Sequence, residues 1–74
     1  MRMRGELNMD ANLLKSKMVL KGDTQNDLAI ALDVSRATLS FKMNQKTNFK
    51  QSEIELISKR YDLSSDEIKQ IFFN

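Results

Sequence analysis

Apolar residues recur along this chain with the three- and four-residue spacing of amphipathic helices. They do so in five stretches, which short polar segments separate. No stretch has the apolar–polar alternation of a half-buried strand, and the chain contains no Pro that would interrupt a helix. The five predicted helices span about residues 10–21, 24–32, 35–44, 50–61 and 65–72.

Each predicted helix has one apolar face, which we expect to point into a shared core. The expected core residues are Leu14 and Met18, flanked by Leu13 and Leu20; Leu28, Ala29 and Leu32; Leu39 and Met43; Ile54, Ile57, Ser58 and Tyr61; and Ile68, Ile71 and Phe72. In the third helix, Thr38, Ser40 and Lys42 are expected to leave the outside polar. Five short helices with brief connections predict a compact all-α domain.

Capping residues mark the ends of several predicted helices. Asp10 is a suitable N-cap for the first helix, and Gly22 suits the position just after its end. Thr24 and Ser64 each begin a capping-box pattern, with an acidic residue three positions later. These signals support the helix boundaries that the apolar spacing predicts.

Residues 31–40, ALDVSRATLS, end one helical pattern and begin another after only two residues. Ser35 is a strong N-cap, and Val34 with Leu39 fits a hydrophobic staple around it. Asp33 occupies the bend, where a positive φ is often needed and where Asp is tolerated after Gly and Asn. The pattern predicts a short second helix held at a fixed angle to the first.

Composition excludes several kinds of chemistry. The chain has no Cys and no His, so it lacks disulfides, thiolate zinc sites and the commonest general base. A domain of 74 residues buries only about 60% of its unfolded surface and has little room for a substrate pocket. We therefore expect no enzyme, no metal site and no cofactor.

Charge is distributed unevenly along the chain, although its net value is only +2. Residues 1–50 contain nine Lys or Arg and five Asp or Glu, whereas residues 51–74 contain three and five. A basic front and an acidic back favour an anionic partner on one side of the molecule.

The pattern divides the chain into a flexible N-terminal arm, residues 1–9, and one domain, residues 10–74. The beginning, MRMRGELN, lacks the apolar stretch of a signal peptide. No apolar run approaches the ~20 residues that cross a bilayer. These features predict a cytoplasmic protein without a membrane segment.

Two stretches resemble a known family. TQNDLAIALDVSRATLSFKMNQK, residues 24–46, resembles the helix-turn-helix of the Cro and phage-repressor family. The matching positions are Thr24, Gln25, Leu28, Ala29, Leu32, the turn residue at 33, Val34, Ser35, Leu39 and Asn44. FKQSEIELISKRYDLSSDEIKQIFF, residues 49–73, resembles the last two helices of small Cro-like regulators in prophages of Gram-positive bacteria. Asp33 and Gln45 depart from the family pattern, since each replaces a usual glycine.

The resemblance implies a compact five-helix, lambda-repressor-like DNA-binding domain, with its helix-turn-helix at the second and third helices. It implies a sequence-specific transcriptional regulator, a Cro-like repressor, that inserts helix 35–44 into the major groove of a double-stranded DNA operator. Such proteins bind as homodimers to two half-sites one turn of DNA apart.

The resemblance also implies roles for individual residues. The expected base contacts are Arg36, Ala37, Ser40 and Phe41. The expected phosphate contacts are Gln25, Ser35, Lys42, Asn44 and Lys46. Phe73, next to a core Phe near the end of the chain, is the expected dimer contact.

Other interpretations of these residues stay open. Arg36 and the lysines also suit a solvated surface, and Ala37 suits any helix. Phe41 also suits the seam with the fourth helix or a contact with a protein partner, and Phe73 also suits a position folded back on the domain. The alternative function is a protein-binding modulator or antirepressor that uses the helix-turn-helix face to bind another phage repressor.

Overall fold

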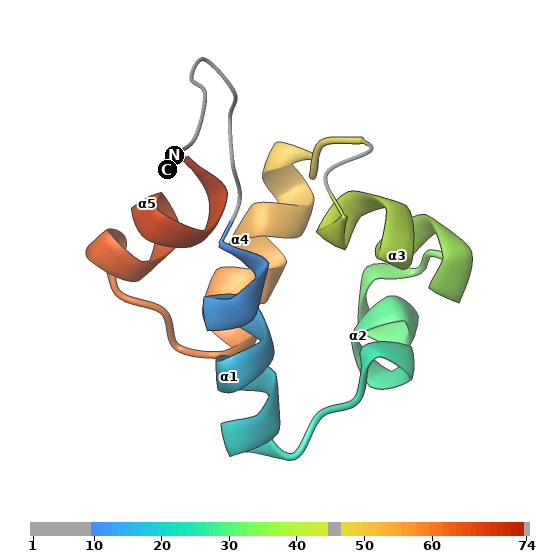
Figure 1. Ribbon diagram of the computed structural model, residues 1–74, viewed down its shortest axis with the longest axis horizontal. Helices are drawn as coiled ribbons and strands as arrows, with labels where there is room; N and C mark the ends of the chain where they lie inside the picture. The colour runs from blue at the N-terminus through green and yellow to red at the C-terminus, as the bar shows by residue number, and fades with distance from the viewer. Residues whose placement is uncertain (1–9, 45–46, 74) are drawn as a thin grey trace.

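Five helices form the chain's secondary structure in the computed structural model, which describes residues 10–44 and 47–73. They are α1 (Ala11–Lys21), α2 (Gln25–Leu32), α3 (Arg36–Met43), α4 (Gln51–Arg60) and α5 (Ser65–Phe72). The described residues contain no strand, so the expected compact all-α architecture of five helices is confirmed. In Figure 1, α5 lies on one side of α1 and α4, and α2 and α3 lie on the other.

The predicted caps hold the beginnings of the helices. The Asp10 carboxylate accepts a hydrogen bond from the Leu13 N–H (3.0 Å), and the Ser35 hydroxyl accepts one from the Thr38 N–H (3.0 Å). Thr24 and Ser64 each begin a complete capping box, in which the side chain three residues later accepts from the cap's own N–H. Local sequence therefore determines where these helices start.

All five helices contribute side chains to one core. Its buried members are Leu14, Met18, Leu28, Ala29, Leu32, Leu39, Met43, Ile57, Tyr61 and Ile71, with Leu13, Val34, Phe49, Leu63 and Phe72 partly buried against them. Leu20, expected to flank the core, is instead 82% exposed. Since Leu20 follows the buried Met18 by only two residues, it lies on a different face of α1.

Three residues with positive φ separate successive helices. Gly22 (φ 80°) ends α1, and Asp33 (φ 60°) ends α2 with the left-handed conformation that the bend predicted. The Asp33 and Val34 N–H groups then donate to carbonyls in the last turn of α2. Asp62 (φ 53°), after α4, has the same conformation, which the sequence analysis did not anticipate.

Polar contacts join segments that are distant in sequence. The Arg60 guanidinium donates two hydrogen bonds to Asp23 (2.6 and 3.0 Å), and the Tyr61 hydroxyl donates a third (2.6 Å). These bonds, chiefly those from Arg60, lower the pKa of Asp23, while burial raises the pKa of Tyr61. This cluster ties the link between α1 and α2 to the end of α4.

A second set of contacts holds α1 against α5. Lys17 forms an ion pair with Glu67, and its hydrogen bond to that carboxylate lowers the pKa of Glu67. The Asp10 N–H donates to the Ile71 carbonyl (2.9 Å), which joins the start of α1 to the end of α5.

None of the helices in residues 10–44 and 47–73 combines the length and the apolar character needed to cross a membrane. The proposed N-terminal arm, residues 1–9, lies outside the described residues.

Replacing Asp33 by glycine is expected to stabilise the fold. Glycine adopts a positive φ without the strain of a side chain, and the change removes a negative charge from the carboxyl end of α2. The free energy of unfolding should rise by about 0.5–1 kcal/mol for Asp33→Gly. Urea denaturation followed by circular dichroism measures it.

Gly22→Ala is the control in the opposite direction, because it adds a side chain at a position with positive φ. A Cβ at Gly22 would meet no atom within 4 Å, so the substitution tests the positive φ alone. It should lower the free energy of unfolding by about 1 kcal/mol. A lower stability of Asp33→Gly would show that the Asp33 side chain supports the bend.

Candidate functional site

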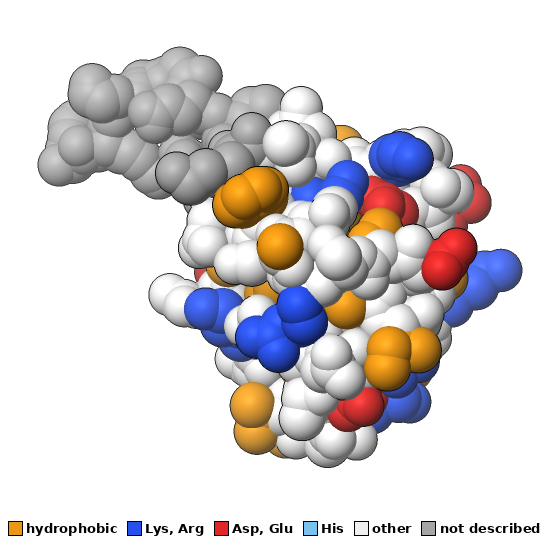
Figure 2. Space-filling view, turned by 90° about the vertical axis from the view of Figure 1, so that its right-hand side faces the viewer, with side chains coloured by type: hydrophobic (Ala, Val, Ile, Leu, Met, Phe, Trp, Pro, Cys, Tyr) orange, Lys and Arg blue, Asp and Glu red, His pale blue; other side chains and the backbone are white. Residues whose placement is uncertain are grey.

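The outer face of α3 carries the side chains that the fold does not use. Leu39 and Met43 are buried in the core, whereas Arg36, Ala37 and Phe41 are exposed. The Ser35 cap sets where α3 begins and therefore which residues face outward. Figure 2 views the side of the molecule where α2 and α3 lie, and shows basic side chains interspersed with hydrophobic, acidic and uncharged ones.

Two strips of side chains make up this outer face because residues four apart lie one above the other on a helix. The polar strip consists of Arg36, the half-buried Ser40 and the exposed Asn44. The Asn44 amide donates to the Ser40 hydroxyl (3.3 Å). The apolar strip consists of Ala37 and Phe41. A partner on this face therefore meets hydrogen-bonding groups beside an apolar surface.

Arg36 stands in the first turn of α3 as the cation of this outer face. Its side chain is exposed, and none of the described residues forms an ion pair with it. A guanidinium presents donors in a planar fork, which fits a carboxylate, a phosphate or the O6 and N7 atoms of guanine. Arg36 is thus available to an external partner.

Phe41 points away from the core and is 53% exposed. This exposure argues against the interpretation that it fills the seam with α4, and Phe49, not Phe41, is among the side chains packed against the core. The Phe49 ring meets Phe72 edge to face, with centroids 5.5 Å apart. The exposed ring of Phe41 is left for contacts outside the domain.

Lys42 does not belong to the outer face, which corrects the expectation that it contacts phosphate. Its side chain is 7% exposed, and its ammonium donates to Glu53 (3.1 Å) and to the Asn48 carbonyl (3.2 Å). The Phe49 ring lies beside the ammonium, 5.8 Å from its centroid. The positive charge of Lys42 is therefore paired within the domain.

Glu53 joins this lysine to the start of α4. One carboxylate oxygen, Oε1, accepts both from the Lys42 ammonium and from the Lys50 N–H (2.8 Å). The same oxygen thus caps α4 and binds the last turn of α3. The Lys42–Glu53 pair fixes how α3 lies against α4, and with it the direction of the outer face.

The other expected phosphate contacts are arranged around α3. Gln25 is half-buried at the first position of α2, and Ser35 is exposed. The Ser35 hydroxyl is engaged within the fold, because it donates to the Thr38 hydroxyl (2.9 Å) while it caps α3. Lys46 lies outside the described residues.

Lys50 is a candidate that the sequence analysis missed. It is the N-cap residue of α4, its side chain is exposed, and its own N–H bonds to the carboxylate that holds Lys42. Its position directly after the polar break at residues 45–49 was the available signal.

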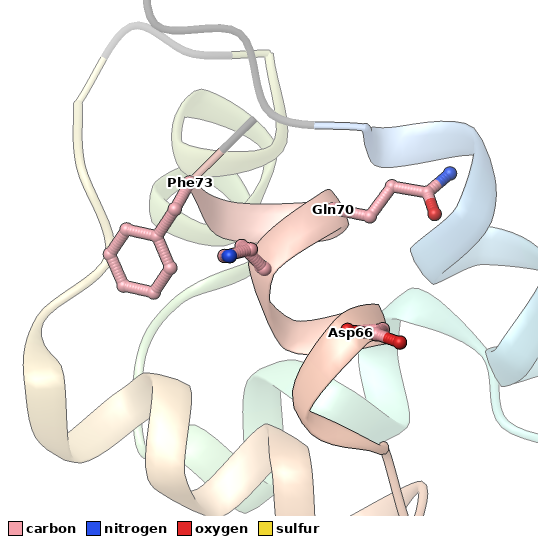
Figure 3. A pocket seen from close by; sticks show the side chains of 4 residues that line it. Asp66, Gln70 and Phe73 are labelled. Carbon is pink, nitrogen blue, oxygen red and sulfur yellow. The ribbon is translucent and has the colours of Figure 1, made fainter.

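The expected dimer contact, Phe73, follows α5 and is 57% exposed. It shares a shallow depression with Asp66, Lys69 and Gln70, and Figure 3 shows the Phe73 ring directed away from Gln70 and Asp66. Its ring meets that of Phe72 edge to face, with the centroids 6.5 Å apart.

The shifted pKa values of Asp23, Tyr61 and Glu67 arise from the ion pairs, hydrogen bonds and burial that join distant segments of the fold. Within the part of the chain that the structure describes, no three acidic side chains gather as they would around a metal ion.

Comparison with models of protein families gives a match over nearly the whole chain. The family model described as "Protein of unknown function (DUF739)" matches residues 7–74. A search of the curated proteins found no match.

Replacing Lys42 alone should destabilise the fold more than replacing both members of the Lys42–Glu53 pair. Lys42→Met leaves the Glu53 carboxylate buried without its cation and should cost about 3–5 kcal/mol of unfolding free energy. Adding Glu53→Gln removes that charge while the amide oxygen still accepts from the Lys50 N–H, so the double variant should regain more than half of the loss. Urea denaturation of the three proteins measures both effects.

Lys15→Met, on the exposed side of α1, is the matched control and should stay within about 0.5 kcal/mol of the unsubstituted protein. The assignment of the pair would be contradicted by a Lys42→Met variant as stable as this control.

Proposed function

We propose that the chain, which belongs to the DUF739 family, is a sequence-specific DNA-binding transcriptional regulator similar to Cro-like phage repressors. In this proposal α2 and α3 form a helix-turn-helix of the lambda-repressor type, and α3 lies in the major groove of an operator. The function is binding alone, without a catalytic step or a cofactor.

The observation that carries the proposal is the short connection between α2 and α3 combined with the free outer face of α3. Asp33, in the left-handed conformation, turns the chain, and Ser35 caps the next helix two residues later. A helix presented in this way can enter the major groove while its first turn faces the bases. The described residues leave Arg36 and Phe41 there without a role in the fold.

Arg36, Ala37, Ser40 and Phe41 are the proposed base contacts. Arg36, at the end of α3 that enters the groove, is suited to bind the O6 and N7 atoms of a guanine. Ser40 supplies a hydroxyl that donates or accepts. The small side chain of Ala37 permits close approach of the helix to the bases.

Phosphate contacts would position the domain without selecting a sequence. Gln25 stands where the first turn of α2 offers free N–H groups, and Asn44 ends α3. Lys46 completes the proposed set, which no longer includes Ser35, because the Ser35 hydroxyl already donates to Thr38. Lys50 takes the place of Lys42, since its ammonium is exposed and that of Lys42 is paired with Glu53.

A homodimer would place two α3 helices in successive major grooves, one turn of DNA apart. The exposed Phe73 at the end of α5 is the proposed dimer contact, because a solvated aromatic ring gains from burial against a second copy.

The exposed Phe41 also favours a second candidate, a modulator that binds another repressor through the same face. Salt separates the two functions. DNA binding weakens by roughly 0.9 log unit per log unit of salt for each phosphate neutralised, whereas an apolar protein interface resists salt.

Selection of binding sequences from random DNA duplexes at moderate salt tests the proposed function. The expected result is enrichment of an inverted repeat whose half-sites are about 10 bp apart. Folded protein that enriches no sequence would contradict the proposal and favour the modulator.

Arg36→Ala should weaken binding to the selected duplex by about 1–3 kcal/mol and leave binding to unrelated DNA nearly unchanged. The physical reason is the loss of the paired hydrogen bonds to guanine. Fluorescence anisotropy with selected and scrambled duplexes measures both affinities.

Lys15→Ala removes one positive charge from the exposed side of α1 and serves as the control. Equal specific affinity of Arg36→Ala and Lys15→Ala would mean that α3 does not enter the groove with Arg36 facing the bases.

A further inference from the structure

The apolar strip raises a question that the proposed function leaves open, namely which feature of the DNA it contacts. Ala37 and Phe41 lie one helical turn apart and are both exposed. Ser40, another base-contact candidate on α3, is half-buried, and its hydroxyl accepts a hydrogen bond from the Asn44 amide. After Arg36, the residues of α3 that are exposed, Ala37 and Phe41, are thus both apolar.

The distribution of charge on α3 also indicates that contacts beyond its first turn are uncharged. Of its two basic residues, Lys42 is buried against Glu53, and only Arg36 is exposed. One cation at the first turn serves one guanine. Discrimination further along the helix then depends on uncharged contacts.

The major groove offers one apolar group, the 5-methyl of thymine. We infer that Ala37 and Phe41 contact thymine methyl groups beside the guanine bound by Arg36, so that the partner is a duplex whose half-sites are distinguished by thymine methyls. This inference rests on the proposed function. Ala37 admits a methyl close to the helix, and the Phe41 ring, one turn further on, covers the next.

Deoxyuridine isolates this contact, because it pairs as thymine does but lacks the methyl. The probes are the duplex recovered by selection, the same duplex with deoxyuridine at each thymine of the half-sites, and a scrambled duplex. Binding should weaken about fourfold for each contacted methyl removed, the factor that corresponds to ~0.8 kcal/mol per buried carbon.

Two variants assign the effect to the strip. Phe41→Ala should bind the thymine and deoxyuridine duplexes with more similar affinities, since the ring that covers a methyl is gone. Leu20→Ala is the matched control: Leu20 is also a large exposed hydrophobic residue, but it lies on α1. The Leu20→Ala variant should retain the full difference in affinity between the thymine and deoxyuridine duplexes. Both substitutions replace exposed side chains, so neither removes core packing.

Three outcomes would overturn the inference. Equal binding of both duplexes by a protein that still prefers them to the scrambled duplex would refute the methyl contact and leave the proposed function standing. A Phe41→Ala variant with an undiminished difference would refute the role of Phe41. No preference for the selected duplex over the scrambled one would overturn the proposed function and the inference with it.

Discussion

The Lys42–Glu53 ion pair is the contact on which the direction of α3 depends. Removing two charges from water is costly, and the cost is offset only when the geometry satisfies both groups. Here one ammonium bonds to a carboxylate and a backbone carbonyl, and the same carboxylate caps α4. Rotating or sliding α3 would leave a buried charge without its partner. The pair therefore specifies one arrangement of α3 on α4, even if it adds little net stability.

In that arrangement the inner and outer sides of α3 have different roles. The inner side, with Leu39 and Met43, belongs to a core shared by all five helices. Other polar contacts hold the frame around it, with Asp23 joined to Arg60 and Lys17 to Glu67. These groups make the contacts that stabilise the fold, and the side chains on the outer side of α3 do not take part in them. The outer side of α3 is therefore free for a partner. The proposed function follows from that separation, with Arg36 as its cation and Phe41 as its exposed ring.

Local features of this fold were predictable from the sequence, and tertiary polar pairing was not. Caps and apolar spacing act over three or four residues, so the helix bounds and most of the core followed from the pattern. The positive φ of Asp33 was predictable because two helical patterns met there. The same conformation at Asp62 was overlooked, although Asp62, Leu63 and Ser64 repeat the Asp–apolar–Ser order of residues 33–35 between two helical patterns. Lys42 was misplaced because its partner lies eleven positions later, and a helical period does not show which lysine meets a carboxylate. Lys50 was overlooked although its position directly after residues 45–49 was an available signal.

The most direct test of the account is an NMR titration of the ¹⁵N-labelled protein with the duplex recovered by selection. If α3 enters the groove with its outer side toward the bases, the largest chemical-shift changes should fall on residues 35–44, with smaller changes at Gln25 and Lys50. The Lys17–Glu67 contact between α1 and α5 should show none. Changes concentrated on α1, with α3 unaffected, would contradict the claim that the free face of α3 is the binding surface.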